Sequence, residues 1–341
     1  MDRKKILSKW TLRTLAAVAL FSIAPWAASG QSIDEVYKMA LKEGGTFNFY
    51  GTMAQVNAAK VLPAFEKRFP GIKVNHVDTT ADKLVARAVT EARGGKILGD
   101  VFQTNLENVG QMHEQELLLD KIPPEAASYP SNLKGLYWVS TDLQFIVAAW
   151  NTSLVKKNEE PKEFEDFANP RWKNRIIAEP RDLELLLGLA KYKYKSDEKA
   201  IALLKKIAAN NVEFHKGHSD LAELLVAGQA AVCLTCYAHH YPPRMKKGAP
   251  VNFMRTEGIT NIQAVAVFKN APHPNTAWLW ARWILSEEGQ KAMAEGGREP
   301  AHPKVESVEK LRPERLYALN VADYKEFQKY GKIWKEIFQL R

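Results

Sequence analysis

Two cysteines, two histidines and two tyrosines lie close together between Cys233 and Tyr241. Cysteine and histidine ligands suggest zinc, but zinc sites generally take them from two separated pairs. The cysteines, Cys233 and Cys236, end an apolar stretch typical of a strand, in which residues three apart point to opposite faces. We therefore expect two buried thiols, with a local disulfide as the alternative. His239 and His240 follow at a predicted helix start, and one of them is expected to face a ligand.

Arg181 is the candidate side chain for binding an anion. It follows Pro180 at a predicted helix start, where backbone N–H groups and the helix dipole favour negative charge. The alternative for Arg181 is a surface ion pair with an acid such as Glu184. For Trp138, the alternative to forming an apolar wall of the ligand site is burial in the apolar core. Neutral hydrogen bonds and apolar walls for a ligand are expected from Thr52, Thr79, Thr80, Thr104, Asn105, Tyr50, Tyr237 and Trp138.

The elements that must position these side chains alternate between strands and helices. Ser32, with Glu35 three residues later, forms a capping box that predicts a helix over residues 32–42. Strands are predicted at 46–50, 72–77 and 100–103, and helices at 54–69, 82–91 and 105–115. This alternation indicates βαβ units with a mainly parallel sheet, in which ligands bind beyond the C-terminal ends of the strands. The loops expected at the site are 50–53, 78–80 and 104–105.

A second region begins near Trp138. The apolar run Phe145–Trp150 is typical of a buried central strand. Further strands are predicted at 175–178, 230–235 and 262–268. Helices are predicted from Leu183 and at 199–209, 221–226, 277–285, 287–294 and 324–338.

The first 30 residues have the order of a secretory signal peptide: a basic head, the apolar run Leu15–Ala24, and small residues at Ala28 and Gly30. We therefore expect a cleaved leader and a periplasmic protein. The 48 basic and 39 acidic residues are scattered, so nucleic-acid binding is not expected, and the mild positive balance hints at an anionic ligand. The sequence has neither a G-x-S-x-G nor an H-E-x-x-H motif, so we do not expect an enzyme, and a secreted hydrolase is the remote alternative.

Several segments match one family in order and spacing between about residues 46 and 300: 49–51, 62–66, 70–74, 99–102, 150–155, 161–173, 277–278 and 284–290. They resemble the extracellular solute-binding proteins of bacterial ABC importers, in the branch that includes ferric-ion binders. The resemblance implies an α/β, two-lobed periplasmic-binding-protein fold, each lobe a mainly parallel sheet flanked by helices, that shuts around its solute. The implied boundaries are a signal peptide at 1–30, a first lobe at 31–137 completed by about 259–310, a second lobe at 138–258, and a C-terminal helical segment at 311–341.

The same resemblance bears on the ligand. Ferric binders of the family use a histidine or tyrosine after the first strand, often an acid after the third, and adjacent tyrosines on the second lobe. Met53 and Asn105 stand at the first two positions here, and Tyr237 and Tyr241 are not adjacent. We therefore predict an organic or oxyanionic solute, with ferric iron, held by Tyr237, Tyr241 and His240, as the alternative. No cofactor is expected; the partners implied are the solute and a membrane permease, and the chain is expected to be a monomer.

Overall fold

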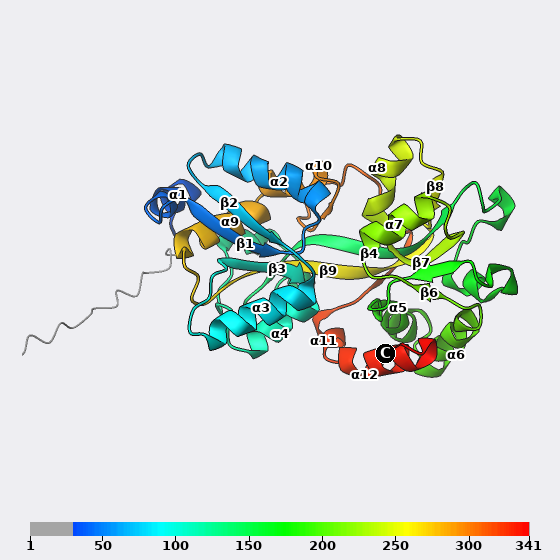
Figure 1. Cartoon of the computed structure of the whole chain (residues 1–341). Helices are drawn as coiled ribbons and strands as arrows, with labels where there is room; N and C mark the ends of the chain where they lie inside the picture. The colour runs from blue at the N-terminus through cyan, green and yellow to red at the C-terminus, as the bar shows by residue number, and fades with distance from the viewer. Residues whose placement is uncertain (1–29, 341) are drawn as a thin grey trace, which may run out of the picture.

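The computed structural model describes residues 30–340, so the predicted signal peptide, apart from Gly30, lies outside the described residues. Two lobes lie side by side and are joined by two long antiparallel strands, β4 (Val139–Asn151) and β9 (Glu257–Val267) (Figure 1). All strands form one connected sheet with the order β2-β1-β3-β9-β4-β7-β5-β6; β8 and β10 pair with β4, and β11 pairs with β9. The two lobes therefore share the central pair of strands.

The first lobe is built on three parallel strands, β1 (Thr46–Gly51), β2 (Lys73–Asp78) and β3 (Val101–Asn105). Aromatic side chains of Phe47, Phe65 and Trp280 pack together on one face of this sheet. The capping box predicted at Ser32 is present and begins the first helix. The helices of the lobe are α1 (Ile33–Leu41), α2 (Gln55–Arg68), α3 (Ala81–Arg93), α4 (Leu106–Glu114), α9 (Pro274–Leu285) and α10 (Glu287–Glu295).

The second lobe carries the parallel strands β5 (Ile176–Ala178), β6 (Glu213–Phe214) and β7 (Val232–Tyr237) and the short strand β8 (Val251–Phe253). Trp334 and Phe338 of the C-terminal helix α12 (Phe327–Phe338) pack in the apolar core of this lobe. Its other helices are α5 (Glu184–Gly188), which continues as a π turn at Leu189–Lys193, α6 (Asp197–Ala208), α7 (His218–Val226) and α8 (Tyr241–Lys246).

The segment 311–341, predicted as helical, also contains a strand. β11 (Arg315–Ala318) pairs with β9 before the short helix α11 (Val321–Tyr324). The strand β10 (Glu299–Pro300) pairs with β4. The 3-10 turns of the described structure are Pro124–Ser128, Ser131–Leu133, Lys157–Glu159, Phe164–Ala168, Pro170–Trp172 and Ala238–His240.

Cys233 and Cys236 form a disulfide, so the prediction of two free thiols is wrong. The reason is a register shift in β7. Val147 of β4 pairs with Cys236 and Ala149 with Cys233, so β7 has one more residue than β4 between the two pairs. Because this extra residue breaks the alternation of the strand, both cysteines face the same apolar cluster.

Candidate functional site

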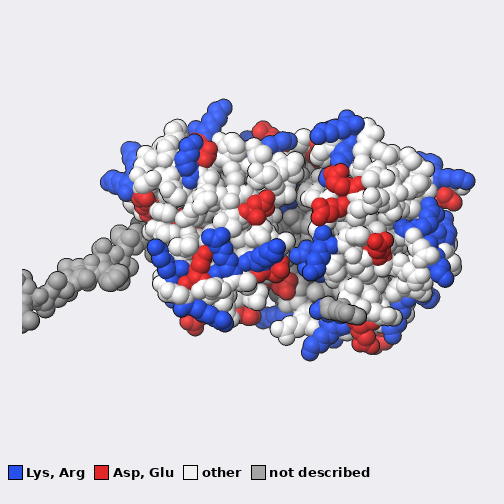
Figure 2. Space-filling view, viewed as in Figure 1, with Lys and Arg blue, Asp and Glu red and all other residues white. Residues whose placement is uncertain are grey.

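A cavity of about 630 Å³ lies between the two lobes, and the space-filling view shows the hollow there (Figure 2). The loops after β1, β2 and β3 form its first side, as the predicted parallel sheet requires. The segment after β5 and the end of β7 form its second side. The structure brings together nine of the predicted site residues as cavity lining: Thr52, Thr79, Thr80, Thr104, Asn105, Arg181, Tyr237, His239 and His240.

The other four predicted residues do not line this cavity. Tyr50 is buried, and its hydroxyl donates to Glu91 Oε1 at 2.7 Å. Trp138 lies in the apolar core of the first lobe, and Tyr241 in that of the second. Met53 lies in the core and borders only a void of about 10 Å³. Sequence position alone did not reveal which side chains at the strand ends turn toward the cleft.

Arg181 lines the cavity, but its charge is already neutralised. Its Nη2 lies 2.5 Å from Oε1 of the fully buried Glu179, and its Nη1 lies 3.7 Å from Asp82 Oδ1 on the first lobe. Arg181 does form an ion pair, as the alternative interpretation of the sequence expected, but its partners are Glu179 and Asp82 and not Glu184. Since both contacts are to carboxylates, the guanidinium expected to receive an anion is occupied.

Acidic side chains outnumber basic ones around the cavity. Six acidic side chains face three arginine or lysine side chains, besides the histidines His218, His239 and His240: Asp78, Asp82, Glu107, Glu179, Asp182 and Glu184 against Arg181, Arg298 and Lys335. The whole chain, in contrast, has a formal charge of +9. Because a cleft lined by one sign of charge concentrates ions of the other, this cavity favours a positively charged solute.

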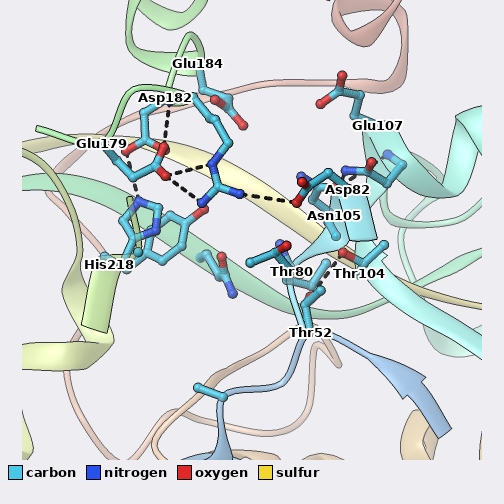
Figure 3. Close-up of a pocket in the computed structure, with 18 of the residues that line it drawn as sticks. Thr52, Thr80, Asp82, Thr104, Asn105, Glu107, Glu179, Asp182, Glu184 and His218 are labelled. Carbon is cyan, nitrogen blue, oxygen red and sulfur yellow. Dashed lines mark hydrogen bonds and ion pairs between the residues drawn. The ribbon is translucent and has the colours of Figure 1, made fainter. Parts of the chain in front are cut away.

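Two of these acids, Glu107 and Glu184, lie at helix starts on opposite sides of the cleft (Figure 3). Burial raises the pKa of Glu107 to about 7. Burial, followed by the negative charges of Asp182, Glu107 and Glu179, raises the pKa of Glu184 well above its ordinary value. Glu184 Oε1 accepts from Asn261 Nδ2 at 2.9 Å, whereas its buried Oε2 has no partner among the described residues.

Tyr237 brings the only phenol among the side chains that line the cavity. Its ring stacks on that of His218 at a centroid distance of 3.8 Å, and His218 Nε2 lies 2.9 Å from Asp182 Oδ2. Burial, and then the carboxylates Asp182, Glu184 and Glu179, raise the pKa of Tyr237 well above its ordinary value. The phenol is therefore neutral at pH 7 in the empty cleft, and a bound cation would favour its ionisation.

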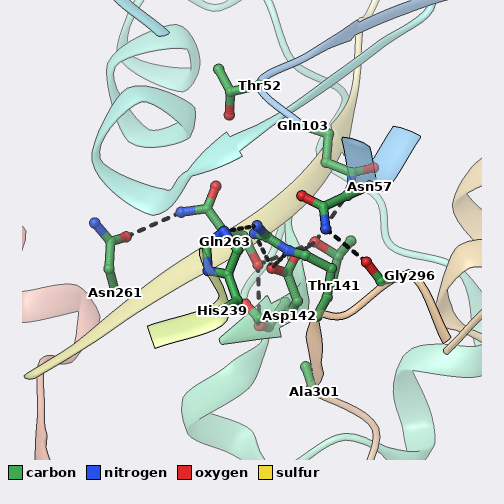
Figure 4. A network of polar contacts seen from close by, with 12 residues as sticks. Thr52, Asn57, Gln103, Thr141, Asp142, His239, Asn261, Gln263, Gly296 and Ala301 are labelled. Carbon is green, nitrogen blue, oxygen red and sulfur yellow. Dashed lines mark hydrogen bonds and ion pairs between the residues drawn. The ribbon is translucent and has the colours of Figure 1, made fainter. Parts of the chain in front are cut away.

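A buried polar network lies at the base of the cleft (Figure 4). Arg298, from the segment after α10, donates through Nε to Asp142 Oδ2 of β4 at 2.8 Å and through Nη1 to His239 Nε2 at 2.9 Å. Burial, and then the charge of Arg298, hold the pKa of His239 well below its ordinary value. His239 is therefore a neutral acceptor, and this network connects the first lobe, the central strands and the second lobe.

Sequence reasoning missed Asp82, Glu107, Glu179, Asp182 and His218, and it considered Glu184 only as a partner of Arg181. Glu107 and Glu184 each lie in the first turn of a helix, where acids are common for reasons of capping and dipole. The one available signal was position, because both helices begin just beyond strands that end at the cleft. In residues 30–340, no group of three or more His, Cys, Asp or Glu side chains is placed to hold a metal ion. No helix within those residues is long and apolar enough to span a membrane.

A model of the family described as bacterial extracellular solute-binding protein matches residues 60–314. The chain belongs to this family. Its members are solute-binding components of transport systems, so the prediction of a solute-binding protein is confirmed at the level of the family.

This solute-binding protein has relatives named for iron. It is 24% identical over 296 residues to iron uptake protein A1 of Synechocystis, covering 80% of each chain. It is 25% identical over 273 residues to the major ferric iron-binding protein of Neisseria meningitidis serogroup B, covering 75% of this chain and 81% of the relative.

Solved structures confirm the predicted fold class, the two-lobed periplasmic-binding-protein fold. Iron-bound HitA from Pseudomonas aeruginosa superposes with a TM-score of 0.72 at 19% identity, covering 86% of this chain and 99% of HitA. AfuA from Actinobacillus pleuropneumoniae, solved with fructose-6-phosphate bound, superposes with a TM-score of 0.73 at 18% identity, covering 87% of this chain and 99% of AfuA. At these identities the likeness concerns the fold.

Proposed function

We propose that the protein is the solute-capturing subunit of an ABC importer, that it works in the periplasm, and that it delivers a positively charged solute to a membrane permease. Ferric iron is the first candidate for that solute. The acidic cavity between the lobes carries the proposal, since six carboxylates line it and two of its three basic side chains are already paired with acids. The anionic solute that the sequence favoured loses its main support for the same reason.

The names of the relatives support iron over other cations, because two of those with the highest coverage are an iron uptake protein and a ferric iron-binding protein. The cavity offers the hard oxygen donors that a small, highly charged ion prefers: the phenol of Tyr237 and the carboxylates around it. Of the three ligands that the sequence suggested for iron, Tyr237 and His240 line the cavity, whereas Tyr241 lies in the apolar core. In this proposal Glu184 takes the place of Tyr241 as an oxygen donor.

A titration with ferric citrate after chelator treatment tests iron binding. We expect a visible charge-transfer band from a phenolate–iron bond and a rise in melting temperature, because a ligand that binds the native state stabilises it. Tyr237→Phe should abolish the band. Tyr241→Phe is the matched control and should keep it, because the Tyr241 hydroxyl is buried and makes no hydrogen bond in the described structure. Citrate alone controls for the anion. If the wild-type protein gives neither band nor stabilisation, iron is not its solute.

An organic cation is the second candidate, and the shape of the cavity favours it. A volume of about 630 Å³ lies within the range of small-molecule sites. The stacked rings of Tyr237 and His218 provide an aromatic wall on which a cationic group can rest. This candidate predicts stabilisation by organic ammonium ions, with no visible band and no response to ferric citrate.

A further inference from the structure

Glu107 and Glu184 differ from most acids of the cavity because no partner neutralises them; Asp78, for which the described structure shows no ion pair either, is exposed to solvent. Glu179 and Asp82 contact Arg181, and Asp182 contacts His218. Glu184, in contrast, is only 5% exposed, yet its Oε2 has no hydrogen-bond partner in the described structure. Leaving a buried carboxylate oxygen without a donor costs free energy, so a group that arrives with the ligand is expected to fill the gap.

The surroundings of the two acids supply negative charge and phenols. The charges that act on Glu184 are those of Asp182, Glu107 and Glu179. Tyr324 of α11 is partly buried, and the charges of Glu184 and Glu107 add to the effect of burial in raising the pKa of its phenol. The charge of Glu184 also raises the pKa of Tyr237. The second lobe brings two cations to the cavity, Arg181 and Lys335, and Arg181 is held by Glu179 and reaches Asp82.

The two acids come from different lobes. Glu107 belongs to α4, which follows β3 on the first lobe, and Glu184 begins α5, which follows β5 on the second. Figure 3 shows the two carboxylates on opposite sides of the upper part of the cavity, with no side chain drawn between them. A positive charge between the lobes can therefore be held from both sides at once.

We propose that Glu107 and Glu184 select the charge of the solute: they hold its positively charged centre between the lobes and exclude anions. The proposal rests on the proposed function, in which the solute is a cation, and adds which residues recognise it. A cation that gains contacts from both lobes binds the closed state better than the open state, and this difference drives closure.

Calorimetric titration with ferric citrate tests the proposal by comparing the wild type with Glu107→Gln and with Glu184→Gln. We expect either variant to bind about thirtyfold more weakly or worse, as when one partner of a buried charge pair is lost. Citrate alone should bind none of the three proteins.

Glu114→Gln is the matched control, because Glu114 is exposed at the far end of the same helix as Glu107. It should keep the wild-type affinity. Wild-type affinity for iron in both Glu107→Gln and Glu184→Gln would overturn the role of the two acids while leaving iron binding intact. Failure of ferric citrate and of every organic ammonium ion to bind would instead overturn the proposed function, and with it the role of both acids.

Discussion

Replacing Glu107 by Gln is expected to stabilise the ligand-free protein at pH 8. The side chain lies in the acidic cavity with no neutralising partner, and burial raises its pKa from 4.5 to about 7. Because a tenfold change in proton affinity corresponds to about 1.4 kcal/mol, the ionised carboxylate costs the folded state at most about 3 kcal/mol. The N-terminus of α4 and partial solvent exposure offset part of this cost. We therefore expect the variant to gain about 1.5 kcal/mol, or about 3 °C in melting temperature.

The pH dependence separates this charge effect from a packing effect. The folded-state pKa of Glu107 is raised, so the cost is absent below pH 4.5, grows between 4.5 and about 7, and is complete at higher pH. Thermal and urea unfolding at pH 4.5 and pH 8 should show most of the gain of Glu107→Gln at pH 8. Glu114→Gln should change little at either pH. A gain that is equal at both pH values, or a loss of stability at pH 8, would refute the reasoning.

Two further predictions concern pairs of residues around the cavity. Arg181→Ala should lower the free energy of unfolding by about 3 kcal/mol, measured by urea unfolding at pH 7, because it leaves the buried Glu179 carboxylate unpaired; an unchanged midpoint would show that Glu179 does not depend on Arg181. The double variant Cys233→Ser, Cys236→Ser should lose about 2 kcal/mol, as expected for a cross-link that closes a very short loop. If its melting temperature equals that of the oxidised wild type and does not respond to a reducing agent, the disulfide does not stabilise β7.

The positions of the elements could be predicted because their signals are local. The capping box at Ser32 and the apolar run Phe145–Trp150 each predict one element, and both elements are present. β4 extends well beyond that run, and this extension could not be predicted. The first half of the strand, 139–144, is rich in polar residues that are buried between the lobes. A polar segment predicts a surface loop, and only its pairing with β9 makes it a strand.

The loops around the cleft followed from the parallel strand order, which is why Thr52, Thr80 and Asn105 line the cavity. The strand order did not predict the direction in which individual side chains point. Tyr50 precedes Thr52 in the same strand-to-loop passage, but its ring turns into the core beneath α3 and α4. The disulfide depended on a register shift between β7 and β4, which is a tertiary feature without a local signal.

The acids of the site could not be found from the sequence for a physical reason. Thirty-nine acidic residues are spread along the chain, and an acid in the first turn of a helix is ordinary. Glu107 and Glu184 become distinctive only when folding places them across one cavity without cations of their own. Arg181, in contrast, was noticed in the sequence, yet folding neutralises it with Glu179.

Small-angle X-ray scattering with and without a saturating cation tests most directly whether two lobes shut around a positively charged solute. Ferric iron, supplied as its citrate complex, is the first cation to use, followed by organic ammonium ions, with citrate alone as the control. The account predicts a smaller radius of gyration when a cation binds and no change with the anion. A shape that stays the same while a cation is bound, or that contracts with an anion alone, would contradict it.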